Sequence, residues 1–170
     1  RDGPPYPVIL VHGLLGARRY GPVDYWWKVP ERLRREGERV YVSEQEPLRT
    51  PLDRAQQLAD FVDHVIEETN AAKVNLIAHS MGGLDARVLV SQLGYGDRIA
   101  SLTTVATPHR GSPVADAIVG SLTFVGLEHL VGDAVGGFVA LVDGDEQEAL
   151  ETAQALTTGA AEDFNAANPD

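Results

Sequence analysis

A serine at position 80 has the sequence surroundings of a catalytic nucleophile. It lies in the segment AHSMGG, residues 78–83, after an apolar run and before a helical pattern. Small residues two before and two after a serine permit the sharp strand-to-helix turn that exposes its hydroxyl, for which G-x-S-x-G is the usual form. Ala78 replaces the first glycine and is still small. The segment therefore predicts a nucleophile elbow with Ser80 at its tip, and the alternative is a serine that only caps the following helix.

A second segment with glycines, VHGLLG at residues 11–16, follows the first apolar run of the chain. Ester hydrolysis through a serine forms a negatively charged tetrahedral intermediate, which backbone N–H groups stabilise. One donor comes from the residue after the nucleophile, and the other from a loop on a neighbouring strand. Met81 and Leu14 occupy these positions. Alone, the segment would indicate an ordinary glycine-rich turn, but together with the elbow it predicts an oxyanion hole.

The chain offers few candidates for the histidine base that a serine nucleophile needs. It has five histidines. His12 lies inside the loop with glycines, and His79 points away from the nucleophile by strand alternation, so both are predicted to be structural. His64 falls beside the apolar stripe of its helix and is predicted to be solvated. His109 follows the fourth strand at the same sheet edge and is a weak candidate for the base, while His129 is a weaker one.

Four short runs rich in apolar and β-branched residues predict strands. Those at residues 8–11 and 74–78 are predicted to be buried parallel strands, and those at 40–42 and 102–105 supply the other two. The runs alternate with helical patterns, which is typical of parallel βαβ units. The predicted fold class is therefore α/β, with a mostly parallel sheet flanked by helices, as in an α/β-hydrolase.

Three helices are predicted between these strands, at residues 29–36, from residue 51 through at least residue 66, and at residues 83–93. The second has the clearest start, because the segment TPLD at residues 50–53 supplies a capping hydroxyl, a first-turn proline and an acid. Asp85 and Arg87 lie on the third helix. We expect them to form a local ion pair or to lie on the helix surface.

The sequence changes character after Pro113. Glycines interrupt an apolar stretch from about residue 115 to residue 142, which predicts short helices with hinges, and a pair of core helices is the alternative. Residues 145–170 are acidic and predict a helical tail with a surface helix. The whole chain, residues 1–170, is predicted to be one domain portion whose core strands and helices lie in residues 6–113.

The composition favours a globular domain and excludes several function classes. The chain has 170 residues, of which 44% are hydrophobic and 23% charged. Its net charge of −11 argues against nucleic acid or an anionic membrane as the main partner. It has no cysteine, which excludes disulfides, thiolate metal sites and a thiol nucleophile. The first residues contain neither an initiator methionine nor the apolar core of a signal peptide.

Four motifs together resemble a known family. The segments are YPVILVHGLLG, GPVDYWWKVP, KVNLIAHSMGGLDAR and ATPHRGSPVAD. In this order they are similar to the secreted bacterial triacylglycerol lipases of the α/β-hydrolase superfamily, densely so over residues 6–115. The resemblance implies that Ser80 is the nucleophile, that Leu14 and Met81 donate to the oxyanion, and that residues 115–142 form a mobile lid over an acyl pocket.

Sequences of this family continue beyond the equivalent of Asp170, and their catalytic acid, histidine and calcium site come from that later part. The resemblance thus implies a lipase or carboxylesterase that hydrolyses acylglycerols through a Ser80 acyl-enzyme. The base and the acid would come from sequence beyond residue 170 or from a second chain. The C-terminal strands of the fold would also come from sequence beyond residue 170.

Secretion, calcium in the complete enzyme and, in many members, a dedicated foldase are also implied by the resemblance. No cofactor or metal site is expected in this chain itself. Two alternatives stay open: a thioesterase or small-ester esterase, and a catalytically incomplete module that binds lipid or a partner.

Overall fold

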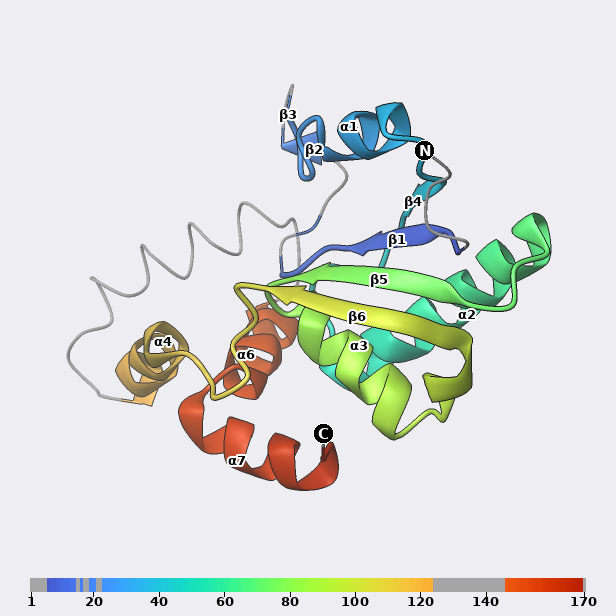
Figure 1. Ribbon diagram of the computed structural model, residues 1–170. Coiled ribbons are helices and arrows are strands. Elements are labelled where there is room, and N and C mark those ends of the chain that lie inside the picture. The colour runs from blue at the N-terminus through green and yellow to red at the C-terminus, as the bar shows by residue number, and fades with distance from the viewer. Residues whose placement is uncertain (1–5, 15, 17–18, 21–22, 124–145, 170) are drawn as a thin grey trace.

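A parallel sheet of four strands lies at the centre of the computed structural model (Figure 1), which describes residues 6–14, 16, 19–20, 23–123 and 146–169. The strands are β1 (Val8–Val11), β4 (Val40–Val42), β5 (Val74–His79) and β6 (Ile99–Val105), in the spatial order β4-β1-β5-β6. All three strand pairs are parallel. The predicted α/β fold class and its parallel sheet are confirmed.

Strand β6 begins three residues earlier than the apolar pattern predicts. Its first half carries Ala100 and Ser101, which are exposed, and Thr103 is exposed as well. The register between β5 and β6 is also irregular at Val74 and Asn75. A strand at the sheet edge can have polar side chains on its open face, so hydrophobicity marks only part of its length.

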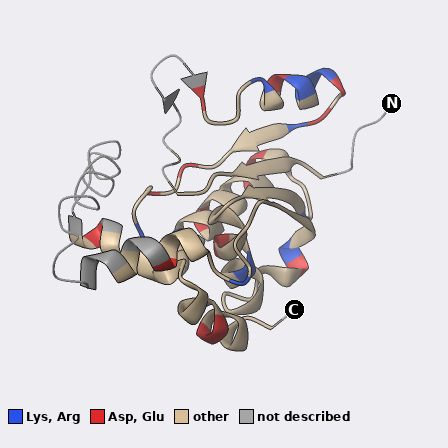
Figure 2. Ribbon diagram, turned by 90° about the vertical axis from the view of Figure 1, so that its left-hand side faces the viewer, with Lys and Arg blue, Asp and Glu red and all other residues tan. Residues whose placement is uncertain are grey.

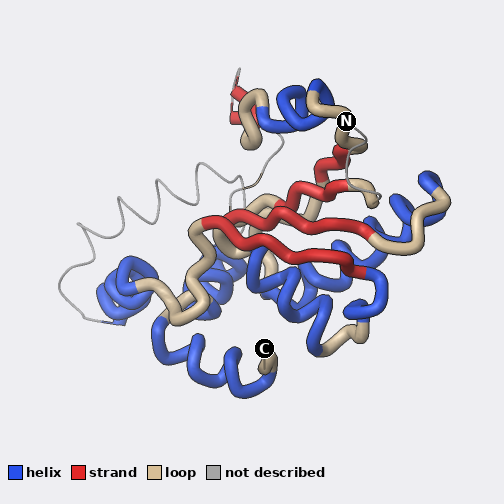
Figure 3. Tube along the Cα trace, viewed as in Figure 1, coloured by secondary structure: helices blue, strands red, loops and turns tan. Residues whose placement is uncertain are grey.

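Alternate residues of β1 face two different layers. Ile9 and Val11 pack into the main core against α2 (Pro51–Thr69) and α3 (Gly82–Ser91). Val8 and Leu10 pack on the opposite face with Trp26 and with Leu33 of α1 (Val29–Arg35). Figures 1 and 3 show α2 and α3 together below the sheet and α1 alone above it, near β4. The sheet is thus covered by helices on both sides, but unevenly.

The start of α2 agrees with its sequence signal. Thr50 caps α2, because its Oγ1 accepts the N–H of Asp53 at 3.3 Å, and Pro51 occupies the first turn. The helix ends at Asn70, whose φ is 49°. A short 3₁₀ helix, η1 (Tyr95–Arg98), separates α3 from β6.

Two further regions complete the described chain. Strands β2 (Arg19–Tyr20) and β3 (Val23–Asp24) form a short antiparallel hairpin before α1. Helices α4 (Pro113–Thr123), α6 (Glu146–Ala155) and α7 (Thr158–Ala167) form the C-terminal part. In Figure 2, α6 and α7 show acidic residues without Lys or Arg.

Of the predictions for the C-terminal part, the structure tests the helical tail but not most of the lid. The helical tail is present, but as two helices, and Thr152, Ala161 and Asn168 in or next to them are buried, so the tail is not purely a surface element. Most of the predicted lid, residues 124–142, lies outside the described residues. In the ranges that are described, no helix is both long and apolar enough to span a membrane.

Candidate active site

The turn between β5 and α3 has the geometry of the predicted nucleophile elbow. Ser80 lies between His79, the last residue of β5, and Met81, the N-cap of α3. Its φ is 54°, in the left-handed region, which costs a residue with a Cβ about 1–2 kcal/mol. Its N–H donates to the carbonyl of Val105 on β6 at 2.9 Å. This strained turn holds the half-buried Ser80 side chain at the carboxyl edge of the sheet.

Glycines allow the loop after β1 to lie directly against this turn. A Cβ on Gly13 would be 2.6 Å from the Cβ of Ser80 and 3.0 Å from its Oγ. A Cβ on Gly82 would be 2.5 Å from the carbonyl oxygen of His12 and 2.8 Å from that of Val11. No side chain fits at either position without movement of the backbone, so the loop with the predicted oxyanion donor lies beside Ser80, the predicted nucleophile.

Substituting Gly82 tests this close approach. Gly82→Ala is expected to lower the free energy of unfolding by about 1–3 kcal/mol, because overpacking against backbone atoms forces a shift of the loop. The measurement is urea denaturation followed by circular dichroism. Gly159→Ala on α7 is the matched control, since nothing lies within 4 Å of its added Cβ. Equal effects of the two substitutions would contradict the prediction.

The carbonyl of Gly13 sets the direction of the Leu14 N–H. It accepts hydrogen bonds from Nδ1 of His12 at 2.9 Å and from the N–H of Gly16 at 3.2 Å. The C=O and N–H of a trans peptide point in opposite directions, so the Leu14 N–H points away from these two partners. Among the residues that the structure describes, neither this N–H nor that of Met81 has a hydrogen-bond acceptor.

The side chains of Leu14 and Met81 also pack in one apolar cluster. The structure thus brings together Leu14 and Met81, two of the residues predicted for the site. Gly13 packs against Ser80, the third. Two N–H groups with no protein acceptor among the described residues are what an oxyanion hole requires.

His12 supports this loop through both ring nitrogens. Nδ1 donates to the Gly13 carbonyl, and Nε2 accepts the N–H of Gln45 at 3.2 Å. These contacts require the neutral ring with its proton on Nδ1. Burial lowers the pKa of His12 from 6.5 to about 4, which keeps the ring neutral at physiological pH. These contacts agree with the structural role predicted for His12.

Arg54 of α2 also holds the loop, and sequence reasoning missed it. The side chain is fully buried. Its Nη2 donates to the carbonyl of His12 at 2.8 Å, and its Nη1 donates to the carbonyl of Glu46 at 2.5 Å. Arg54 occupies a position in the apolar stripe of α2. An arginine inside an apolar stripe is the sequence signal that could have found it, because a buried charge requires specific partners.

The prediction for Asp85 is wrong. Asp85 is fully buried, and its carboxylate accepts from Nε of Arg54 at 2.8 Å, across 31 positions of sequence. It therefore makes neither a local pair with Arg87 nor part of the helix surface. Burial raises the pKa of Asp85 to about 7, and the Arg54 guanidinium opposes this rise.

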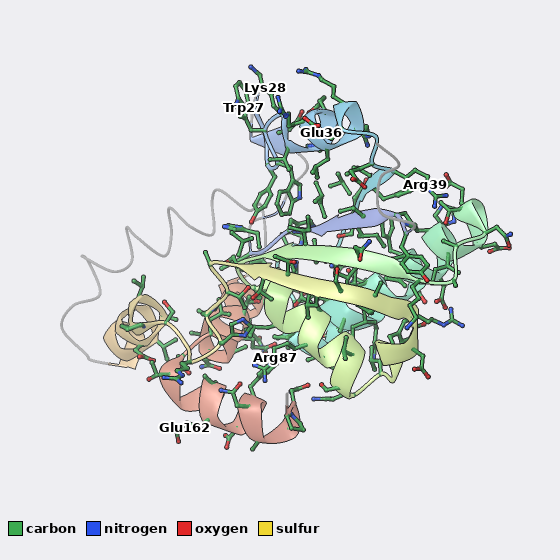
Figure 4. The ribbon with its side chains drawn as sticks, viewed as in Figure 1. Trp27, Lys28, Glu36, Arg39, Arg87 and Glu162 are labelled. Carbon is green, nitrogen blue, oxygen red and sulfur yellow. The ribbon has the colours of Figure 1, made fainter. Side chains whose placement is uncertain are left out.

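The prediction for Arg87 is wrong as well, because this side chain contacts the C-terminal helix. Its Nη1 donates to Oδ1 of Asn165 at 2.7 Å and its Nη2 to the carbonyl of Asn168 at 2.5 Å. The guanidinium also lies 5.2 Å from the ring centroid of Phe164. Figure 4 shows Arg87 between α3 and α7. Arg87 attaches the tail to the helix that begins at the elbow.

The lowered pKa of His12 predicts a loss of stability in acid. Between pH 6.5 and pH 4 the unfolded chain binds a proton at His12 that the folded chain excludes. The stabilising contribution of the neutral His12 ring is therefore complete above pH 6.5 and is lost as the pH falls to 4. This lowers the free energy of unfolding by about 3 kcal/mol.

Asp85 titrates over part of the same range with the opposite sign, so the His12 contribution is isolated with the variant His12→Gln. The excess unfolding free energy of the wild type over this variant should fall by about 3 kcal/mol between pH 7 and pH 4 in urea titrations. If the difference in unfolding free energy between the wild type and His12→Gln did not change with pH, the prediction would be wrong, because His12 would then have the same pKa in the folded and unfolded chains.

The other histidines do not complete a catalytic pair in the described residues. Nε2 of His109 is 3.0 Å from Oγ1 of Thr104 on β6. His64 is 67% exposed and lies near Glu68, which confirms the predicted solvated position. His129 lies outside the described residues. Within the described ranges, no histidine forms a hydrogen bond with Oγ of Ser80.

A cavity of about 660 Å³ lies near the loop, and Ser80 is not among the residues that line it. It opens beside β4 and α1, and its walls include His12, Tyr25, Trp26 and Tyr41. Within the part of the chain that the structure describes, no group of three His, Asp or Glu side chains could hold a metal ion.

The chain matches a known protein family and is similar to lipases of other bacteria. The family described as alpha/beta hydrolase fold matches residues 6–161. The chain is 38% identical to a triacylglycerol lipase of Pseudarthrobacter phenanthrenivorans, over 94% of this chain and 53% of that protein. It is 36% identical to a triacylglycerol lipase of Vibrio cholerae, over 97% of this chain and 54% of that protein.

Solved structures show the same fold. A lipase of Bacillus licheniformis, BlEst2 in its mature form, superposes with a TM-score of 0.74 at 20% identity, over 100% of this chain and 62% of that chain. The chain spans about half the length of the curated relatives named above.

Proposed function

The chain belongs to the α/β-hydrolase fold family, and from this premise we propose that it is the nucleophile-bearing part of a lipase or carboxylesterase. Its substrate would be an acylglycerol ester. The observation that carries the proposal is Ser80 at a positive φ of 54° beside a loop whose Leu14 N–H has no acceptor among the described residues. Triacylglycerol lipases among the relatives support the substrate class.

The proposed reaction is acyl transfer through a covalent intermediate. Oγ of Ser80 attacks the ester carbonyl and transfers its proton to a base, and the N–H groups of Leu14 and Met81 stabilise the oxyanion. The alcohol leaves with a proton from that base. Water then attacks the acyl-enzyme, passes its proton to the same base, and releases the fatty acid and the free serine.

The base is proposed to be a histidine supplied by sequence beyond residue 170 or by a second chain, together with the acid that orients it. The support is that no histidine of the described residues bonds to Oγ of Ser80. Residues 115–142 are proposed as a lid. Their described beginning on α4 is anchored by Asp116, which accepts the N–H of Thr158 at 2.8 Å. Calcium binding, a foldase and secretion stay predictions from the resemblance.

The experiment that tests this function uses the protein produced from its natural gene. It is treated with a fluorophosphonate, which reacts with activated serines, and digested with trypsin. The adduct is expected on the peptide of residues 74–87, which follows Lys73 and ends at Arg87. An intact mass of the same sample shows whether the polypeptide extends past residue 170 or has a companion chain.

Two readouts separate the alternatives. A triacylglycerol emulsion and a short soluble ester are compared as substrates, because a lipase prefers the emulsion and a small-ester esterase the soluble ester. Failure of the fluorophosphonate to label Ser80, with every co-purifying chain present, would overturn the proposal that the protein is a serine hydrolase and would favour a lipid-binding module.

A further inference from the structure

Tyr25, on the segment between β3 and α1, connects the nucleophile elbow to the loop that follows β1. Its hydroxyl accepts the N–H of Gly13 at 3.1 Å and shares a hydrogen bond with Nδ1 of His79. Gly13 precedes the proposed oxyanion donor, and His79 precedes the proposed nucleophile. One side chain thus contacts both halves of the site, without contacting either reacting group.

The peptide between His12 and Gly13 is held at both of its polar ends. Its C=O accepts from Nη2 of Arg54 at 2.8 Å, and its N–H donates to the Tyr25 hydroxyl. Since C=O and N–H point in opposite directions, Arg54 and Tyr25 act on opposite sides of the peptide. Rotation of this peptide would break at least one of the two hydrogen bonds.

This peptide controls the next one. Gly13 has no Cβ and therefore has little intrinsic resistance to rotation about its φ and ψ. The N–H of Leu14 keeps its direction only while the carbonyl of Gly13 stays in place. Within the described residues, the Tyr25 hydroxyl is the only partner of the Gly13 N–H, so its loss would leave this N–H without an acceptor, while the Gly13 carbonyl would keep its hydrogen bonds from Nδ1 of His12 and the N–H of Gly16.

The Tyr25 ring is itself fixed by its neighbours. Its centroid lies 5.9 Å from that of His12, 5.5 Å from that of Trp26 and 5.6 Å from that of His79, all at edge-to-face angles. Burial raises the pKa of Tyr25, which favours the protonated hydroxyl. The hydroxyl can therefore accept from Gly13 and donate to His79 at the same time.

We propose that Tyr25, held by His79, is a positioning residue that fixes the orientation of the Gly13 peptide and thereby aims the Leu14 N–H at the oxyanion. The inference rests on the proposed function. It gives His79 a role through its hydrogen bond with the Tyr25 hydroxyl. Because Tyr25 contacts no reacting atom in this role, its removal should weaken transition-state stabilisation without weakening substrate binding.

The test compares Tyr25→Phe with Tyr95→Phe in the protein produced from its natural gene. Tyr95 of η1 is the matched control, because Tyr95→Phe also removes a hydrogen-bonded hydroxyl, which donates to Asp63 of α2 at 3.0 Å. For Tyr25→Phe we expect kcat to fall about 10- to 100-fold with KM changed less than about 2-fold, less than the 10²- to 10³-fold loss of a whole donor. Tyr95→Phe should leave both constants within about 2-fold.

A second readout does not depend on turnover. Hydrogen exchange of the Gly13 amide, followed by NMR, should accelerate at least about 10-fold in Tyr25→Phe and stay unchanged in Tyr95→Phe, because only the first substitution removes its acceptor. His79→Asn retains Tyr25 but removes its partner, and it should lower kcat in the same direction by a smaller factor. This variant also serves if Tyr25→Phe fails to fold.

The outcomes separate the inference from the proposed function. A wild type that hydrolyses esters, with Tyr25→Phe unchanged in kcat, would overturn the inference alone. A rise in KM at constant kcat would also overturn it, since Tyr25 would then be a substrate contact. If the wild type lacks ester turnover, the proposed function fails, and unchanged Gly13 exchange would overturn the inference separately.

Discussion

Ser80→Ala should reduce kcat for ester hydrolysis by about 10⁵- to 10⁶-fold, because the hydroxyl forms the acyl-enzyme and no other group can replace it. The fold should be unaffected. Alanine retains the Cβ, so the strain of the positive φ at this position stays the same and the free energy of unfolding should change by less than about 0.5 kcal/mol. The measurements are single-turnover hydrolysis and urea denaturation on the same preparation.

Ser80→Gly is the matched control for the strained backbone. Glycine adopts a positive φ without steric cost, so this variant should be as inactive as Ser80→Ala but more stable by about 1 kcal/mol. Hydrolysis that survives both substitutions would assign the nucleophile to another residue. Equal stability of the two variants would show that the turn is relaxed.

Arg54→Met should lower the free energy of unfolding by about 3–5 kcal/mol, because it leaves the carboxylate of Asp85 buried without its counter-charge. It should also lower kcat, since the carbonyl of His12 loses its donor and the loop loosens. The control is Arg98→Met, which removes a partner of Asp63 from a pair whose side chains are 50% and 44% exposed. That substitution should cost less than about 1 kcal/mol.

A double variant separates stability from loop geometry. Adding Asp85→Leu to Arg54→Met removes the unpaired charge, so most of the lost stability should return. The kcat should not return, because no donor to the carbonyl of His12 has been restored. Recovery of both properties together would mean that Arg54 acts on catalysis only through global stability.

The elements of the fold were predictable where local patterns determine them. The apolar stripe and the Thr50 cap define α2, and a continuous apolar run defines β1, because burial on both sides of a sheet leaves a plain hydrophobic signal. In β5 the apolar residues are interrupted only by Asn75 before the strand ends at His79. The small residues around Ser80 predicted the elbow, because a sharp strand-to-helix turn leaves no room for large side chains beside the serine. Local chemistry of this kind needs no knowledge of distant partners.

The polar contacts that support the site were not predictable in the same way. Asp85 pairs with a residue on another helix, and Arg87 with residues on a third, so the sequence spacing on α3 misleads. Tyr25 carries no signal of its own, since an aromatic residue in an aromatic segment is most simply explained by packing. Such partners are determined by the tertiary arrangement, which periodicity does not encode.

The attachment of α7 to α3 through Arg87 has a consequence for how the chain acquires its structure. The two hydrogen bonds join positions 78 and 81 residues apart, whereas the strand pairs and α2 lie within the preceding part of the chain. The strands and helices around the elbow all lie before residue 106, so they are synthesised before α7 (Thr158–Ala167). During synthesis the elbow can therefore assemble before α7 exists, and docking of the tail would be a late event that secures a turn already formed.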